Sequence, residues 1–254
     1  MCHADSGKVS FEGISEQQMD LKVKGVSIPT FAYGYSSGDK KPAVIILHDI
    51  FGAGDFYRDL GKRLADQGFA AFLPDLFHRE GPLPERNREA AMARGAKHSF
   101  VTALEELSVI VDNLSDEGRA VAVVGFCMGG TLGLLSATRF PGLKAAIIYY
   151  GFPVNAKPTP NRPNNPIEEV ADLKAPLLGF FGEADAGVGP DNVRKYQEEA
   201  RKNGKVVEFT IYPGIGHAFL TFDPQEASFE ASQASWEQAI SFLKKETLKK
   251  ETAV

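Results

Sequence analysis

The run Gly125-Phe126-Cys127-Met128-Gly129 has the residue types and spacing needed for nucleophilic catalysis. An apolar stretch precedes it, and a segment of helical spacing follows it. A strained strand-to-helix turn can present a nucleophile when glycines two positions away on each side leave space around it. The helix dipole then favours negative charge on the Cys127 thiol and on a developing oxyanion. We therefore predict that Cys127 is a nucleophile; the alternative is a buried structural cysteine at a glycine-rich junction.

The other two members of a triad should follow Cys127 in the chain order nucleophile, acid, histidine. Asp185 stands just past a later strand, where the acid is expected. Glu183 is the competing acid, but Asp185 lies further into the loop. His217 follows the next strand in the context Gly-Ile-Gly-His and is the candidate general base, which Asp185 would orient.

Two backbone N–H groups are expected to form an oxyanion hole beside the nucleophile. Met128, directly after Cys127, would supply one donor. The loop after the first buried strand, near Ile50, would supply the other. His48 ends that strand and is expected to support the loop.

Sulfur as the nucleophile restricts the substrate. A thiolate leaves a tetrahedral intermediate more readily than an ordinary alkoxide does, so attack on a plain alkyl ester tends to reverse. Acylation proceeds when the substrate's own leaving group is good, such as an enolate or a phenolate, and water activated by His217 then hydrolyses the thioester. A small activated ester or enol lactone is the expected substrate.

Buried strands and helices alternate around these residues. Short apolar runs are typical of parallel strands that are buried on both faces, and they are expected at residues 42–48, 69–73, 119–125, 145–150, 176–181 and 206–212. Helices are expected at residues 55–67, 99–114, 129–138, 192–203 and 224–249. This alternation predicts an α/β fold of the α/β-hydrolase type, with a mostly parallel central sheet and helices on both faces.

We expect one domain over residues 1–254, with residues 1–18 loosely ordered. Residues 20–35 predict an edge hairpin that turns at Gly25. Two Pro-rich stretches, 75–98 and 151–172, are longer than ordinary connections and are candidates for active-site loops.

The composition disfavours several kinds of partner. The 28 basic and 33 acidic side chains leave a net charge of −5, which disfavours nucleic acid or an anionic membrane as the partner. The longest apolar runs are far shorter than a membrane span. Two cysteines and no secretory leader favour the cytoplasm. Apart from Met1-Cys2-His3, no group of cysteines and histidines has metal-ligand spacing, so no metal is expected.

Several segments together resemble the dienelactone hydrolase (carboxymethylenebutenolidase) family, from about Ala43 to the C-terminal helix. The likeness rests on HDIFG at 48–52, PDLFHR at 74–79, GFCMGG at 125–130, YYG at 149–151, GEAD at 182–185 and GHAF at 216–219. The cysteine turn combined with the first two segments is more specific than a triad alone.

The resemblance implies the same triad and oxyanion residues, and it adds further roles. Arg79 matches an arginine that binds a substrate carboxylate, and Phe51 and Tyr149 match aromatic residues that line the pocket. Asp49 matches a residue that activates the thiol. Members of the family act without a cofactor on a small anionic lactone, so no cofactor is expected here.

The chain departs from the family pattern at two positions. The family has a Glu that hydrogen-bonds the resting thiol, and here Asp49 is one methylene shorter. Thr221 stands where a second carboxylate-binding arginine would make a bidentate contact. Arg86, Arg88 or Arg94 could substitute, although the simplest interpretation of these three is a solvated helix face.

Three functions are consistent with these residues. The first is a cysteine-dependent hydrolase of a small anionic enol lactone. The second is a broader carboxylesterase or lactonase for activated esters, which the departures at Asp49 and Thr221 keep open. The third is a non-catalytic ligand-binding protein with the same fold, which would be expected to carry a broken triad or oxyanion loop. The oligomeric state does not follow from the sequence.

Overall fold

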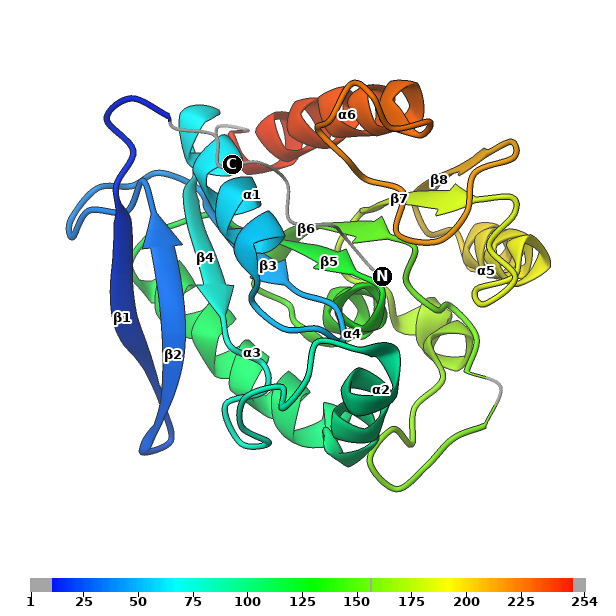
Figure 1. The fold of residues 1–254 in the computed structure, drawn as a ribbon, viewed down its shortest axis with the longest axis horizontal. Coiled ribbons are helices and arrows are strands. Elements are labelled where there is room, and N and C mark those ends of the chain that lie inside the picture. Colours follow the sequence, from blue (N-terminus) through cyan, green and yellow to red (C-terminus); the bar gives the residue numbers. More distant parts are fainter. Residues whose placement is uncertain (1–10, 156, 249–254) are drawn as a thin grey trace.

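The computed structural model describes residues 11–155 and 157–248, and at its centre is one eight-stranded sheet (Figure 1). The strand order is β1-β2-β4-β3-β5-β6-β7-β8. Strands β3 to β8 are parallel, and β2 is antiparallel to both β1 and β4. The strands are β1 Glu16–Val23, β2 Val26–Tyr33, β3 Ala43–Leu47, β4 Ala70–Pro74, β5 Val121–Phe126, β6 Leu143–Tyr149, β7 Leu177–Gly182 and β8 Val207–Tyr212.

Helices cover both faces of the sheet, as Figure 1 shows. One apolar cluster joins the sheet to α1 and α6, and a second joins its other face to α3, α4 and α5. The helices are α1 Asp55–Asp66, α2 Arg88–Lys97, α3 Phe100–Asp116, α4 Met128–Arg139, α5 Pro190–Lys202 and α6 Phe229–Thr247. The predicted α/β-hydrolase architecture is confirmed. None of the helices in the described ranges is long and apolar enough to span a bilayer.

The edge hairpin turns at the predicted position. Lys24 and Gly25 both have positive φ, 46° and 83°, as the two-residue turns that match strand twist require. The expectation of a loosely ordered N-terminus falls outside the described residues for positions 1–10. It is wrong for residues 16–18, because β1 begins at Glu16, whose carboxylate accepts a hydrogen bond from the Tyr33 hydroxyl over 2.7 Å.

Both stretches that were predicted to be irregular contain helical structure. Helix α2 occupies residues 88–97, and Asn87 caps it by accepting from the Ala90 N–H over 2.8 Å. A 3-10 helix, Pro166–Asp172, ends the second stretch. Helix α2 was not predicted because prolines and charged residues flank it, although the segment itself is rich in helix-forming alanine and arginine. Helix α2 brings the side chain of Arg94 to the loop after β3.

Candidate functional site

Cys127 lies on the turn between β5 and α4. Its φ of 53° and ψ of −112° fall in a region where a non-glycine residue is strained. The Cys127 N–H donates to the Tyr149 carbonyl over 3.0 Å, and the side chain is buried. The predicted strand-to-helix turn is confirmed, and the sulfur stands at the N-terminus of α4.

Gly125 and Gly129 are required by close backbone contacts. A Cβ atom on Gly125 would lie 2.2 Å from the Gly129 carbonyl oxygen, and one on Gly129 would lie 2.0 Å from the Leu47 carbonyl oxygen. The sequence pattern indicated that the glycines leave space around the cysteine. In the structure they chiefly make room for the first turn of α4 and the end of β3. Helix α4 thus starts beside the loop that follows β3.

The order of the strands brings the three predicted triad residues to one edge of the sheet. Strand β6 pairs in parallel with β5 on one side and with β7 on the other, and β8 pairs with β7. Carboxyl ends of parallel strands lie at the same edge. Cys127 follows β5, Asp185 follows β7 and His217 follows β8.

Asp185 and His217 are joined by a short hydrogen bond. His217 Nδ1 lies 2.6 Å from Asp185 Oδ2, and Asp185 Oδ1 accepts from the N–H groups of Gly187 and Val188 over 3.0 and 3.1 Å. Burial would raise the pKa of Asp185, but the hydrogen bond and charge of His217 and these two N–H groups outweigh burial and lower it. Asp185 is therefore an ionised acceptor that leaves Nε2 of His217 for another partner. Glu183 is exposed and accepts from the Gly214 N–H instead.

Tyr150 and Phe152 are the aromatic residues that flank His217. Their rings lie 5.0 and 5.8 Å from the imidazole. Tyr149, predicted to line the pocket, is fully buried, as Tyr150 is, and its hydroxyl lies 3.4 Å from Ser235 Oγ of α6. Successive side chains of a strand face opposite sides of the sheet, so Tyr149 at the end of β6 packs under α6. The neighbouring Tyr150 is the tyrosine in contact with His217, and a role for Tyr149 in lining the pocket stays a prediction.

The loop that carries Ile50 is held by an arginine from α2. Arg94 donates to the Ile50 carbonyl over 3.0 Å and to the Gly81 carbonyl over 3.3 Å. Its guanidinium carbon lies 3.9 Å from the centre of the Phe77 ring, and the residue is only 8% exposed. The interpretation of Arg94 as part of a solvated helix face is therefore wrong. Arg94 fixes the loop whose Ile50 N–H is the predicted oxyanion donor.

His48 supports the same loop from within the core, as expected. Burial lowers the pKa of His48 to about 4, so the imidazole is neutral at pH 7. Its Nδ1 lies 2.8 Å from the Asp49 carbonyl, and its Nε2 accepts from the Leu76 N–H over 3.0 Å. The proton therefore resides on Nδ1, and the ring joins the loop after β3 to the loop after β4.

Asp49 is a buried carboxyl group at the start of this loop. Oδ1 accepts from the Phe51 N–H over 2.8 Å, while Oδ2 is buried and forms no hydrogen bond within the described residues. Burial, the largest effect, raises the pKa of Asp49 to about 6, although Phe51, Tyr57, His217 and Arg86 act in the opposite direction. Asp49 is thus poised to exchange a proton in mildly acidic solution.

The raised pKa of Asp49 predicts a pH-dependent stability. Its protonated form is favoured in the folded state, so this stabilisation is present below about pH 4 and is lost as pH rises through about 6. Relative to Asp49→Asn, the wild type should lose roughly 2 kcal/mol of unfolding free energy between pH 4 and 7, measured by urea denaturation. Asp191→Asn is the control, because the Asp191 side chain is 86% exposed. A wild-type-to-Asp49→Asn difference that stays constant over this range would contradict the prediction.

Arg79 and Thr221 have protein partners. Arg79 Nε donates to Glu106 Oε1 over 2.9 Å, and its side chain is 45% exposed. The Thr221 N–H donates to Ser232 Oγ over 3.1 Å. Arg88 is exposed on the first turn of α2. Arg79 would have to leave Glu106, or share it, in order to bind a substrate.

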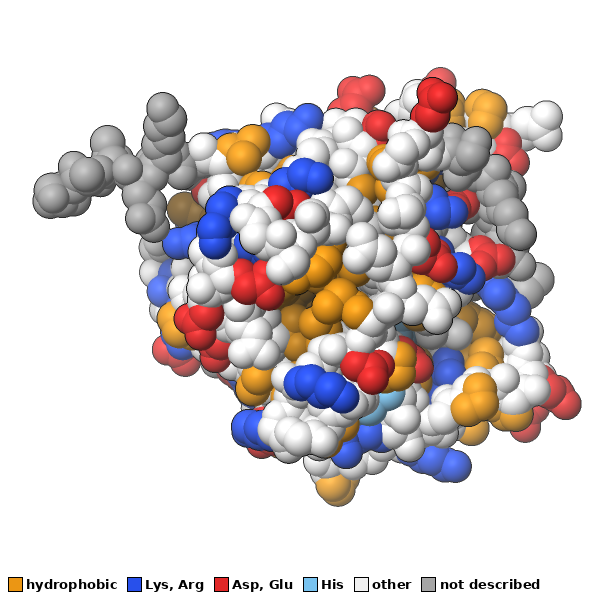
Figure 2. All heavy atoms as spheres, turned by 90° about the vertical axis from the view of Figure 1, so that its left-hand side faces the viewer, with side chains coloured by type: hydrophobic (Ala, Val, Ile, Leu, Met, Phe, Trp, Pro, Cys, Tyr) orange, Lys and Arg blue, Asp and Glu red, His pale blue; other side chains and the backbone are white. Residues whose placement is uncertain are grey.

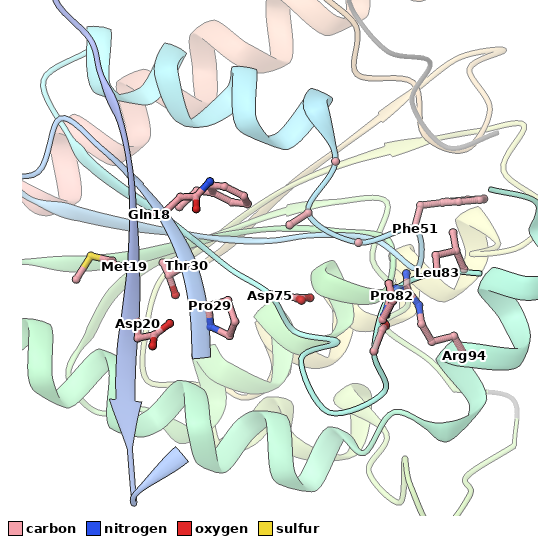
Figure 3. A pocket seen from close by; sticks show the side chains of 15 residues that line it. Gln18, Met19, Asp20, Pro29, Thr30, Phe51, Asp75, Pro82, Leu83 and Arg94 are labelled. Carbon is pink, nitrogen blue, oxygen red and sulfur yellow. Dashed lines mark hydrogen bonds between the residues drawn. The ribbon is translucent and has the colours of Figure 1, made fainter. Parts of the chain in front are cut away.

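A cavity of about 710 Å³ lies between the hairpin and the loop after β3. Figure 2 shows hydrophobic side chains in a hollow on the face that carries the hairpin. In Figure 3, hairpin residues line one side of the cavity, and Phe51, Pro82, Leu83 and Arg94 lie across from them. None of the predicted triad residues is among those that line this space. Phe51, predicted to line the substrate pocket, borders this cavity.

Within residues 11–155 and 157–248, no group of three or more His, Cys, Asp or Glu side chains is arranged to hold a metal ion. The candidate site in the described chain therefore consists of a thiol, an imidazole, carboxylates and backbone N–H groups.

Comparison with known proteins identifies the family of this chain. The sequence profile described as "Dienelactone hydrolase family" matches residues 28–247. A carboxymethylenebutenolidase of Rhodococcus opacus is 30% identical over 249 residues, which cover 96% of this chain and 97% of the relative. A Bradyrhizobium protein assigned as a 2-oxo-3-(5-oxofuran-2-ylidene)propanoate lactonase is 27% identical over 237 residues, which cover 92% and 95%.

Among solved structures, a Klebsiella pneumoniae protein assigned as a dienelactone hydrolase superposes with a TM-score of 0.83. The two are 26% identical, and the match covers 91% of this chain and 98% of the other.

Proposed function

This chain belongs to the dienelactone hydrolase family of enzymes that act on ester bonds, and from this premise we propose that it hydrolyses a small anionic enol lactone through Cys127, His217 and Asp185. The observation that carries the proposal is the 2.6 Å Asp185–His217 pair at the sheet edge where Cys127 stands on its strained turn. A thiol, a base and a residue that orients the base are the parts that nucleophilic acyl transfer requires.

The reaction begins with transfer of the Cys127 proton to His217 and attack of sulfur on the lactone carbonyl carbon. The N–H groups of Ile50 and Met128 stabilise the negative charge that forms on the carbonyl oxygen. Collapse of this intermediate breaks the ring C–O bond and returns the proton to the leaving enol oxygen. The ring-opened substrate is then bound to Cys127 as a thioester.

Water then completes the cycle. His217 takes a proton from water, the oxygen attacks the thioester, and the Cys127 sulfur leaves and regains the proton. The product is the ring-opened acid. Asp185 remains ionised throughout and stabilises the imidazolium form of His217, in keeping with its lowered pKa.

Two arguments support an enol lactone over a simple alkyl ester. An enolate competes with thiolate as a leaving group, whereas an alkoxide does not, so the acyl-enzyme accumulates only with activated esters. The Bradyrhizobium relative is assigned to a lactone of this class that carries a carboxylate. The neutral side chain at Thr221, where the family resemblance implies an arginine, favours a second candidate function as an esterase with a broader range of activated esters.

The test is turnover of a carboxymethylene butenolide followed by its ultraviolet absorbance, beside the saturated lactone that carries the same carboxylate. We expect kcat/KM for the enol lactone to exceed that for the saturated lactone by at least about 100-fold, because the enol oxygen competes with sulfur as a leaving group and the alkoxide of the saturated lactone does not. Comparable rates for the two lactones would contradict the proposal. Fast hydrolysis of phenyl esters alone would instead identify the broader esterase.

A further inference from the structure

Arg162 is a half-buried cation without an acidic partner. It lies in the connection between β6 and the 3-10 helix, and none of the described carboxylates pairs with it. Burial lowers the pKa of Arg162, and the one charge that favours its ionised form is that of Cys127. By contrast, Arg79 has Glu106 and Arg139 has Glu169. A desolvated guanidinium that faces no carboxylate retains unused capacity for an anion.

The connection holds Arg162 in a defined place. Thr159 and Arg162 form an antiparallel bridge with backbone hydrogen bonds of 3.1 and 2.9 Å. Between them, Asn161 donates to the Ala96 carbonyl over 3.0 Å and accepts from the Phe100 N–H over 2.8 Å. These contacts fasten the connection to the junction of α2 and α3.

The guanidinium of Arg162 reaches toward the oxyanion loop. A Cβ atom built on Gly95 of α2 would lie 3.5 Å from Arg162 Nη2 and 3.6 Å from Ile50 Cγ2, so the two side chains flank the same point. Nη2 donates to the Gly95 carbonyl, and the guanidinium carbon lies 4.5 Å from the centre of the Phe100 ring. One of the five N–H groups is thus used for the end of α2, and within the described part of the chain no other hydrogen bond of this guanidinium is found.

We propose that Arg162 binds the carboxylate of the substrate while Cys127 attacks its lactone carbonyl. This rests on the proposed function for the identity of the substrate, but recognition of an anion beside Cys127 can be measured without it. A planar guanidinium binds a carboxylate through two parallel N–H···O bonds. Arg162 is then a specificity-determining residue in place of the arginine missing at Thr221.

The test compares alkylation of Cys127 by iodoacetate and by iodoacetamide, reagents of similar shape that differ in charge. Both form an S–C bond and release iodide, and peptide mass spectrometry separates Cys127 from Cys2. In Arg162→Gln, the ratio of the iodoacetate rate to the iodoacetamide rate should fall about five- to tenfold from the wild-type value. Because both reagents need the thiolate, a change in thiol pKa cancels in the ratio.

Arg88→Gln is the matched control, since Arg88 is exposed on α2, and it should leave the ratio unchanged. Arg162→Lys keeps the charge without the fork and should give an intermediate ratio, which also covers the case that Arg162→Gln does not fold. An unchanged ratio in both Arg162 variants, or a fall in Arg79→Gln only, would overturn the proposal. The same variants assayed on the enol lactone acid and its methyl ester link the effect to turnover. Absence of turnover in the wild type with a lowered alkylation ratio in Arg162→Gln would refute the proposed function and leave anion binding by Arg162 intact.

Discussion

Cys127→Ala is expected to lower kcat for the enol lactone by at least about 10⁴-fold, because the variant has no nucleophile with which to form the acyl-enzyme. The proposed oxyanion donors and His217 cannot replace covalent catalysis, since water would have to attack the lactone carbonyl directly. Stopped-flow absorbance measures the loss, and circular dichroism checks that the variant is folded. Little change in folding is expected, as removing one sulfur leaves the strained turn and both glycines in place.

The chain offers its own control for this variant. Cys2 is the only other cysteine, and Cys2→Ala should retain wild-type turnover. Rapid quenching of the wild type with substrate should also trap an added mass on the peptide that contains Cys127. Turnover by Cys127→Ala at the wild-type rate would refute the thiol mechanism, whatever the substrate.

Gly129→Ala is expected to destabilise the fold by more than about 3 kcal/mol. The added Cβ would lie 2.0 Å from the Leu47 carbonyl oxygen and 2.6 Å from that of His48. Both contacts are with backbone at the end of β3, which is bound between β4 and β5 and cannot move aside. Either α4 or the loop after β3 must shift, so activity should fall together with the midpoint of urea unfolding.

Gly133→Ala, on the same helix, is the matched control with a milder steric conflict. There the nearest atom to an added Cβ is the terminal methyl of Ile148, at 2.8 Å, and a side-chain end can rotate. Alanine also stabilises a helix by about 1 kcal/mol relative to glycine, so Gly133→Ala should cost far less than Gly129→Ala. Equal stability of the two variants would show that α4 does not depend on its close approach to β3.

Much of the fold and the positions that carry the chemistry could be predicted from local pattern. Apolar runs and helical spacing located the six parallel strands and five of the helices. The glycines around Cys127 predicted the strand-to-helix turn, and the order of Asp185 and His217 after two later strands predicted that they would share its edge. These features depend on residues close together in the chain, so the sequence contains the information directly.

Helix α2 and the first residues of β1, from Glu16 onward, were missed because their local signals are weak and tertiary contacts stabilise them. Glu16 is paired with Tyr33 and Arg58. Arg94 of α2 inserts between Phe77 and the Ile50 carbonyl. Polarity alone assigns such residues to the surface, and only the packing of distant segments provides partners that allow a guanidinium to be buried.

The sequence by itself determined the class of fold and the nucleophile, acid and base that we propose, since each follows from periodicity or from a motif along the chain. The tertiary structure decided which side chains surround them. It placed Tyr150 rather than Tyr149 beside His217, paired Arg79 with Glu106 and brought Arg162 toward Ile50. Contacts between segments far apart in sequence depend on the path of each loop and the rotamer of each side chain, and neither is encoded in local spacing.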